Sequence, residues 1–321
     1  VGTAARVQRK SRMRNDLPYP PSFPNEAEEK YLWLLLCDDS DFPEHFEHWR
    51  NDTIVEGLDT ARMWLLPLLH LRISALNIED DLTTRRIRGV YKFVGLKNRK
   101  LIRDVAVVAQ ACHDEGIPIM LLKGLALLQH AYHDTASRLL GDGDILVHAE
   151  HVARIFALFK RLGWMRVDEF GTRSEICVPS DDAFRETRPD RRDHAATFIN
   201  DGGVMIDLHW QVFHTDLRQD ALRMLLVRDL SPVNARTRLS AHHWKNSLAT
   251  ELDGVACHTL SLEDMLIHVI AHGGAENPHR PIRWVIDAAY IIRTGKLDWK
   301  KLIKATQISG KEVDMLLAFR Y

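Results

Sequence analysis

Residues 138–147 read Arg-Leu-Leu-Gly-Asp-Gly-Asp-Ile-Leu-Val, and this stretch decides how the chain is interpreted. Asp142 and Asp144 lie two residues apart beside an apolar run, which predicts a buried strand over 142–148. Side chains alternate across a strand, so both carboxylates point to one face, and Gly143 lets the opposite face pack closely. Two neighbouring carboxylates repel each other unless a cation lies between them, and hard divalent cations prefer such ligands. The stretch therefore predicts a site for Mg²⁺ or Mn²⁺.

An Asp-x-Asp triplet also occurs in solvated turns, so the pair needs support from elsewhere in the chain. Asp207 lies between Ile206 and Leu208 in a strand predicted over 204–210. Burying an unpaired charge is costly, so this acid needs an arginine partner or a shared metal. His209 lies on the same strand face as Asp207. A third acid thus supports the metal site, although a simple ion pair remains an alternative.

A possible phosphate site precedes the acid pair. The apolar run 117–122 predicts a buried strand that leads into a helix over 125–133. Gly124 permits close approach of the backbone to a ligand, and the first turn of the helix offers free N–H groups to an anion. Lys123 adds a positive charge at the same place.

The order of these motifs resembles the bacterial "uncharacterised nucleotidyltransferase" family of the polymerase-beta-like nucleotidyltransferase superfamily. The resemblance covers roughly residues 30 to 310. It is carried by Leu122-Lys123-Gly124, Tyr132, Arg138, Gly141 to Val147, Ile206 to Trp210, Ser261 to Asp264, His268, His272, Ile282 to Asp287 and Leu297 to Trp299.

The resemblance implies metal-dependent transfer of a nucleoside monophosphate, with two metals bound by three acids. Asp142, Asp144 and Asp207 would be the catalytic metal ligands, and Asp207 would also be the general base. The expected donor is a nucleoside triphosphate such as ATP. The expected acceptor is a small molecule or a peptide.

The resemblance also implies nucleotide-binding residues. Lys123, Gly124 and Gly141 would meet the triphosphate, and Arg138 would clamp it because a guanidinium fork suits phosphate oxygens. The wider superfamily has Gly-Ser where this chain has Lys-Gly, so the phosphate contacts differ in detail.

The sequence gives less support for placing other polar side chains in the predicted metal and nucleotide site. His194 and His209 either orient substrate and acids or simply pack beside the predicted hairpin. The histidine pair His268 and His272 has helical i, i+4 spacing, but a structural role is favoured because no third ligand is evident. Two further groups are expected to be structural or solvated. They are Arg283, Trp284 and Asp287, as an internal ion pair and core anchor, and the loop arginines Arg185, Arg188, Arg191 and Arg192.

The periodicity predicts an α+β protein, in which a small mixed-sheet nucleotidyltransferase core is flanked by helical regions. Helices are expected over 55–73 and from Asp80 or Asp81 to Glu115, and from about Gln211 to the end. Strands 195–199 and 204–210 form a hairpin around Asn-Asp-Gly-Gly. The expected segments are a tail and Pro-rich linker (1–25), an N-terminal helical region (26–115), the α/β core (116–212) and a C-terminal helical region (213–321).

Composition narrows the class of partner. The formal net charge is −1, which argues against bulk nucleic acid or an anionic membrane as the main partner. The four cysteines form no Cys-x-x-Cys pair, and free scattered thiols suit the cytoplasm. No apolar run is long enough to span a bilayer, and a cytoplasmic enzyme is therefore expected.

Three alternatives remain open. A catalytically silent relative would bind a nucleotide or a partner, with at least one acid misplaced. A toxin-like transferase would act on tRNA or protein. A metal-dependent phosphohydrolase would need a tight His-Asp cluster, and no such spacing is evident near Asp142 and Asp144.

Overall fold

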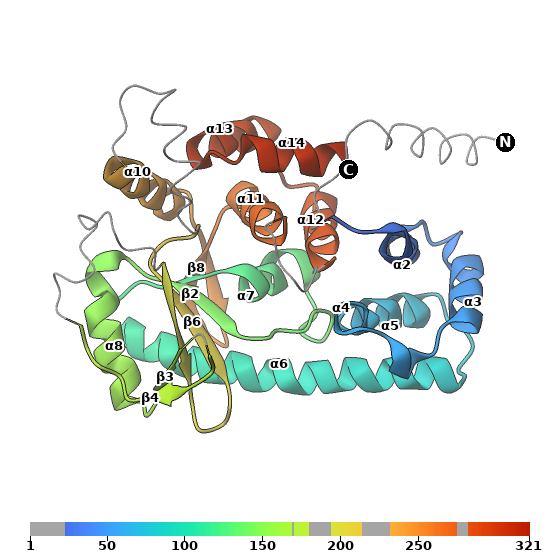
Figure 1. Cartoon of the computed structure of the whole chain (residues 1–321), viewed down its shortest axis with the longest axis horizontal. Helices are drawn as coiled ribbons and strands as arrows, with labels where there is room; N and C mark the ends of the chain where they lie inside the picture. Colours follow the sequence, from blue (N-terminus) through green and yellow to red (C-terminus); the bar gives the residue numbers. More distant parts are fainter. Residues whose placement is uncertain (1–22, 169, 180–193, 214–231, 275–281) are drawn as a thin grey trace.

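The computed structural model describes residues 23–168, 170–179, 194–213, 232–274 and 282–321. Its centre is a mixed eight-stranded sheet with the strand order β4-β3-β5-β6-β2-β1-β8-β7 (Figure 1). The α+β class with a mixed sheet is confirmed. Most of the N-terminal tail and the four loop arginines fall outside the described residues. The strands are β1 (Met120–Leu121), β2 (Gly143–Leu146), β3 (Met165–Val167), β4 (Arg173–Ser174), β5 (Ala195–Ile199), β6 (Met205–His209), β7 (Leu248–Leu252) and β8 (Val255–Thr259).

The middle of the sheet brings the acids together. β5 and β6 form the predicted hairpin, and β6 runs parallel to β2 with Asp207 opposite Asp144. The strand predicted over 142–148 spans only 143–146, so Asp142 lies immediately before it. Two acids that are 63 positions apart in the sequence therefore lie on adjacent strands.

The C-terminal part contains strands that the sequence analysis misses. Helices alone are expected after about Gln211, but β7 and β8 form a hairpin that extends the sheet through pairing of β8 with β1. Asp253 and Gly254 form its turn, with φ of 49° and 81°. This is the Asp-Gly signal of a two-residue hairpin. The exposed side chains of edge strand β7 obscure the alternation that would identify a strand.

The N-terminal part is helical, and one of its expected helices is divided in two. Asn25 caps α2 through reciprocal hydrogen bonds with Glu28. The single helix expected over 55–73 is divided, because Asp59 caps one helix and Pro67 starts the next. The long helix from Asp81 is confirmed. These helices are α2 (Glu26–Leu36), α3 (Phe42–Asp52), α4 (Thr60–Met63), α5 (Leu66–Ala75) and α6 (Leu82–Asp114).

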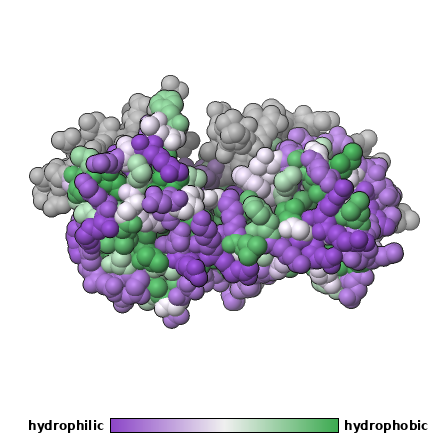
Figure 2. Space-filling view, turned by 90° about the horizontal axis from the view of Figure 1, so that it is seen from below, coloured by the Kyte–Doolittle hydropathy of each residue, from purple (hydrophilic) through white to green (hydrophobic). Residues whose placement is uncertain are grey.

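Helix α6 runs along one side of the molecule and joins the N-terminal helices to the sheet (Figure 1). It packs against α5 and against β2, β7 and β8. A Cβ on Gly143 would lie 2.6 Å from Val105 Cγ2, which confirms that this glycine permits close packing. Figure 2 shows the side on which α6 lies, where hydrophilic side chains surround scattered hydrophobic ones. Two side chains of α6, Phe93 and Leu96, are exposed hydrophobic residues.

Of the remaining helices, α8 (Val152–Arg161) contacts α6, whereas α7 (Lys123–Leu127) and α11 (Leu262–Gly273) lie across the sheet from α6 (Figure 1). The helix expected over 125–133 begins at Lys123 and continues as a π-helical turn to Tyr132. Of the strand expected over 117–122, only Met120–Leu121 pairs as a strand. Within the described segments, no helix combines the length and the apolar character needed to cross a membrane. The helices after Lys123 are α7 (Lys123–Leu127), α8 (Val152–Arg161), α10 (Pro232–Lys245), α11 (Leu262–Gly273), α12 (Arg283–Arg293), α13 (Trp299–Ser309) and α14 (Glu312–Arg320).

Candidate active site

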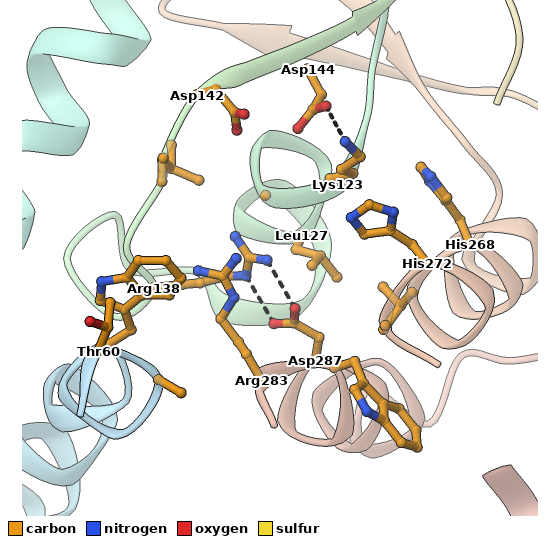
Figure 3. Close-up of a pocket in the computed structure, with 18 of the residues that line it drawn as sticks. Thr60, Lys123, Leu127, Arg138, Asp142, Asp144, His268, His272, Arg283 and Asp287 are labelled. Carbon is orange, nitrogen blue, oxygen red and sulfur yellow. Dashed lines mark hydrogen bonds and ion pairs between the residues drawn. The ribbon is translucent and has the colours of Figure 1, made fainter. Parts of the chain in front are cut away.

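Asp142 and Asp144 point into the same cavity from the start of β2 (Figure 3). Asp144 is buried, with 3% of its surface exposed. Its Oδ1 accepts a hydrogen bond from Lys123 Nζ at 2.5 Å and lies 2.9 Å from His209 Nε2. The sequence analysis predicts a common face for the two acids, and the arrangement in the figure agrees with it.

Asp207 joins this group from β6. Its Oδ1 accepts a hydrogen bond from the Thr197 hydroxyl at 2.6 Å, across the β5–β6 ladder. Potential ligand atoms of Asp144, Asp207 and His209 all lie within 4.8 Å of one another. Two carboxylates and an imidazole at this spacing could hold a divalent metal. Asp142 is outside this group, so its role as a ligand stays a prediction.

The electrostatics of the two neighbouring acids differ. Burial, together with the charges of Asp144 and Asp207, raises the pKa of Asp142 to about 6. Burial also acts to raise the pKa of Asp144, but the hydrogen bond from His209 and the charge of Lys123 outweigh it and lower that pKa. Asp144 is therefore compensated by its protein neighbours, whereas at Asp142 the charges of Lys123 and Arg283 do not outweigh burial and the neighbouring acids.

Lys123 is held toward Asp144 by an unusual backbone. Its φ is 43°, in the left-handed region that residues with a Cβ rarely adopt. Burial acts to lower the pKa of Lys123, but the Asp144 carboxylate overcomes this and raises it. The ammonium group lies among the acids, with its one described ion pair to Asp144. Contact of Lys123 with a triphosphate, as the resemblance implies, stays a prediction.

Arg138 is tied to the C-terminal region. Its Nε and Nη2 each donate to the Asp287 carboxylate at 2.9 Å, and the Tyr132 hydroxyl donates to the same group at 2.6 Å. A Cβ on Gly124 would lie 2.4 Å from Arg138 Nη1, so this glycine makes room for the guanidinium. The expected ion pair of Asp287 therefore exists, but its partner is Arg138 and not Arg283. The edge of the guanidinium predicted to clamp phosphate is taken by a carboxylate.

Arg283 has a different environment. Its Nη1 donates to the Leu139 carbonyl oxygen at 3.1 Å, and its guanidinium lies 5.1 Å from the centre of the Trp64 ring. No ion pair joins it to a carboxylate of the described residues. Burial and the charge of Arg138 lower the pKa of Arg283 to about 10, which leaves it charged at neutral pH. The sequence analysis interprets Arg283 as part of an internal ion pair, and this is wrong.

Three parts of the chain enclose the cavity, whose volume is about 750 Å³. The N-terminal helices contribute Trp64, the core contributes the acids with Gly141, and α11 and α12 form the other wall. His268 and His272 lie on that wall beside Lys123 (Figure 3). Burial and the charge of Lys123 lower the pKa of His272 to about 4, so it is neutral at pH 7. The histidine pair assigned to packing therefore borders the cavity.

His194 and His209 lie beside each other at the site. The two rings are 5.6 Å apart, and His209 contacts Asp144. The structure therefore places a His-Asp cluster beside the acid pair. The expectation that no such cluster lies near Asp142 and Asp144 is wrong, because pairing of β2 with β6 creates it from distant positions.

The comparison with protein families agrees with the resemblance seen in the sequence. The model of a family described as "Uncharacterised nucleotidyltransferase" matches residues 60–320. No curated protein matches the chain. A crystal structure of an antigenic nucleotidyltransferase-like protein from Paracoccidioides brasiliensis matches at 15% identity with a TM-score of 0.35, and covers 68% of this chain and 91% of that chain.

Proposed function

The chain belongs to the uncharacterised nucleotidyltransferase family, and from this premise we propose that it transfers a nucleoside monophosphate from a nucleoside triphosphate to an acceptor, with release of pyrophosphate. The accepting group is a hydroxyl or phosphate of a small molecule or peptide. One observation carries the proposal, which is the pairing of Asp144 with Asp207 on adjacent strands beside the cavity that Asp142 enters. We further propose that ATP is the donor and that the cytoplasm is the compartment.

The side chains at the acid cluster are suitable ligands for a divalent metal. Asp142 and Asp207 carry charge that Lys123 does not neutralise, and the raised pKa of Asp142 reflects this. Asp144, Asp207 and His209 lie close enough to share an ion, and Asp142 would complete the set. Oxygen ligands favour Mg²⁺, and Mn²⁺ tolerates an imidazole among them. When bound, such a metal supplies charge stabilisation for the phosphates and activates the accepting hydroxyl.

The chain's own residues have distinct parts in this proposal. The Thr197 hydroxyl orients the Asp207 carboxylate, which would accept the proton of the acceptor hydroxyl. Lys123 and His209 keep Asp144 ionised. The helices from both ends of the chain surround the reacting groups and limit access of water. The cavity suits a small acceptor, which favours this reading over a transferase acting on tRNA.

A metal-dependent phosphohydrolase is the second candidate, because His209 contacts Asp144 beside Asp207. The two reactions leave different products. A nucleotidyltransferase releases pyrophosphate only when an acceptor is present, whereas a hydrolase releases phosphate or pyrophosphate without one.

The first test measures turnover of the four ribonucleoside triphosphates with Mg²⁺ or Mn²⁺ and a panel of hydroxyl and phosphate acceptors. We expect acceptor-dependent pyrophosphate release with one donor, and a loss of about 1,000-fold in Asp207→Asn and in Asp142→Ala. Thermal shift with each triphosphate reports binding separately. Binding without turnover would identify a silent relative, and release without an acceptor would identify a hydrolase.

A further inference from the structure

Two arginines meet at the cavity, Arg138 buried and Arg283 half-buried, and among the described residues only Arg138 has a carboxylate partner. Arg138 is matched by Asp287 through two hydrogen bonds of 2.9 Å. Arg283 comes from the first turn of α12, the helix that also carries Asp287, and its described contacts are with a carbonyl oxygen and an aromatic ring. Neither contact carries a full negative charge. A guanidinium in this setting has its charge available to an anion.

The unmatched charges lie at opposite positions across the cavity. On the sheet side, no ion pair of the described residues joins Asp142 to a cation, since Lys123 is paired with Asp144. On the α12 side, Arg283 is not balanced within the described residues. Figure 3 shows the Arg283 guanidinium directed toward the same space as the Asp142 carboxylate. A ligand that fits both must carry a metal at one end and anionic oxygens at the other.

We propose that Arg283 binds the triphosphate chain of the donor, with Trp64 holding its guanidinium in place, and that Arg138 is a structural residue. The inference rests on the proposed function, because it assigns a role within the same site. A planar guanidinium can donate two parallel hydrogen bonds to phosphate oxygens, which an ammonium cannot do. The ring of Trp64 supports the guanidinium face, and the N–H groups that do not donate to Leu139 can bind a ligand.

This assignment explains why the N-terminal helices belong to the site. Trp64 follows α4, whereas Arg283 begins α12, so their contact joins the two ends of the chain across the cavity. A donor bound there is contacted by the core and by both helical regions. The family match begins at residue 60 and therefore includes both residues.

The test measures binding of inorganic tripolyphosphate and of ATP by calorimetry, with Mg²⁺ present, to the full chain. Arg283→Met keeps the length of the side chain and removes its charge. We expect it to weaken binding of both probes by roughly 10-fold to 100-fold, the usual range for loss of charge-assisted hydrogen bonds. Arg283→Lys should recover part of the loss, since it restores the charge without the fork.

Arg293→Met is the matched control. Arg293 lies on the same helix, is exposed, and donates to the Leu36 carbonyl oxygen away from the cavity. We expect its affinity for both probes to equal that of the wild type. Inorganic phosphate serves as a third probe, and we expect Arg283→Met to reduce the preference for tripolyphosphate over phosphate. A purely structural role would not change that preference.

Two negative results have different meanings. Wild-type binding of tripolyphosphate that Arg283→Met and Arg283→Lys both retain would overturn the role of Arg283 and leave the proposed function intact. Absence of wild-type binding to either probe would remove the donor site, and the inference would be overturned together with the proposed function.

Discussion

Two groups of charged side chains lie at or beside the cavity, and they are built in opposite ways. In the first group, Arg138 forms an ion pair with Asp287, and the Tyr132 hydroxyl donates a further hydrogen bond to the same carboxylate. In the second group, Asp142, Asp144 and Asp207 share a single lysine, and one of the acids has a strongly raised pKa. A matched buried pair holds structure together, whereas an unmatched one indicates a missing ligand. The contrast separates the scaffold from the candidate site.

The largest effect on stability is expected from breaking the matched group. Asp287→Ala leaves the guanidinium of Arg138 buried, with 7% of the residue exposed, and without its carboxylate. We expect the free energy of unfolding to fall by about 3 to 5 kcal/mol, the usual cost of an unpaired buried charge. Urea unfolding at about pH 7.5 measures the change.

Glu26→Gln is the control for that measurement, because Glu26 forms an exposed ion pair with Lys30 on α2. Exposed pairs contribute little, so no change is expected. Arg138→Met combined with Asp287→Leu should cost less than Asp287→Ala alone, since neither charge is then left unpaired. A loss below about 1 kcal/mol in Asp287→Ala would show that the pair does not act as a structural tie.

Removal of a charge from the group of Asp142, Asp144 and Asp207 should raise the stability of the metal-free protein, the opposite of the effect expected for Asp287→Ala. The pKa of Asp142 is raised from 3.8 to about 6, so the folded protein binds this proton more tightly than the unfolded chain. The carboxyl therefore favours folding below about pH 4, and this contribution is lost as the pH rises through about 6. Asparagine does not ionise, so Asp142→Asn avoids the cost of a charged carboxylate at this position in the folded protein. The variant should therefore be more stable than the wild type by about 2 kcal/mol at about pH 7.5 without metal.

Urea unfolding with a chelator, repeated at about pH 4, 6 and 7.5, tests this sign. The difference between variant and wild type should be near zero at the lowest pH and full at the highest. Added Mg²⁺ should stabilise the wild type more than Asp142→Asn. A variant that is less stable than the wild type at every pH would mean that Asp142 is matched by a protein group after all.

Much of the candidate site could be predicted because its signals are local. Asp142 and Asp144 stand beside an apolar run, and Asp207 stands within another, so alternation indicates which face each acid takes. The hairpin of β5 and β6 is marked by its turn residues. The same kind of signal existed at Asp253 and Gly254 but was outweighed by the polar character of β7.

The partners of the buried charges could not be predicted in this way. Arg138 and Asp287 are 149 positions apart, and Asp144 and His209 are 65 apart. Both pairs depend on which strands and helices become neighbours in space. Arg138 and Arg283 have the same chemistry in the sequence, and only the fold decides that, among the described residues, the first has a carboxylate partner and the second does not.

The smallest expected effect concerns the backbone that carries the acids, with no change of charge. A Cβ on Gly143 would lie 2.6 Å from Val105 Cγ2, so Gly143→Ala must displace β2 or α6. We expect Gly143→Ala to lower the free energy of unfolding by about 1 to 3 kcal/mol through overpacking.

Val105→Ala alone leaves a cavity, but it makes room for the new methyl group in the double variant. The double variant should therefore be about 1 kcal/mol more stable than the two single changes predict when added, as a double-mutant cycle measures. Restored stability with turnover still reduced would show that the acids depend on the exact position of β2. Strict additivity would contradict the close contact between β2 and α6, and with it the explanation of why glycine separates the two acids.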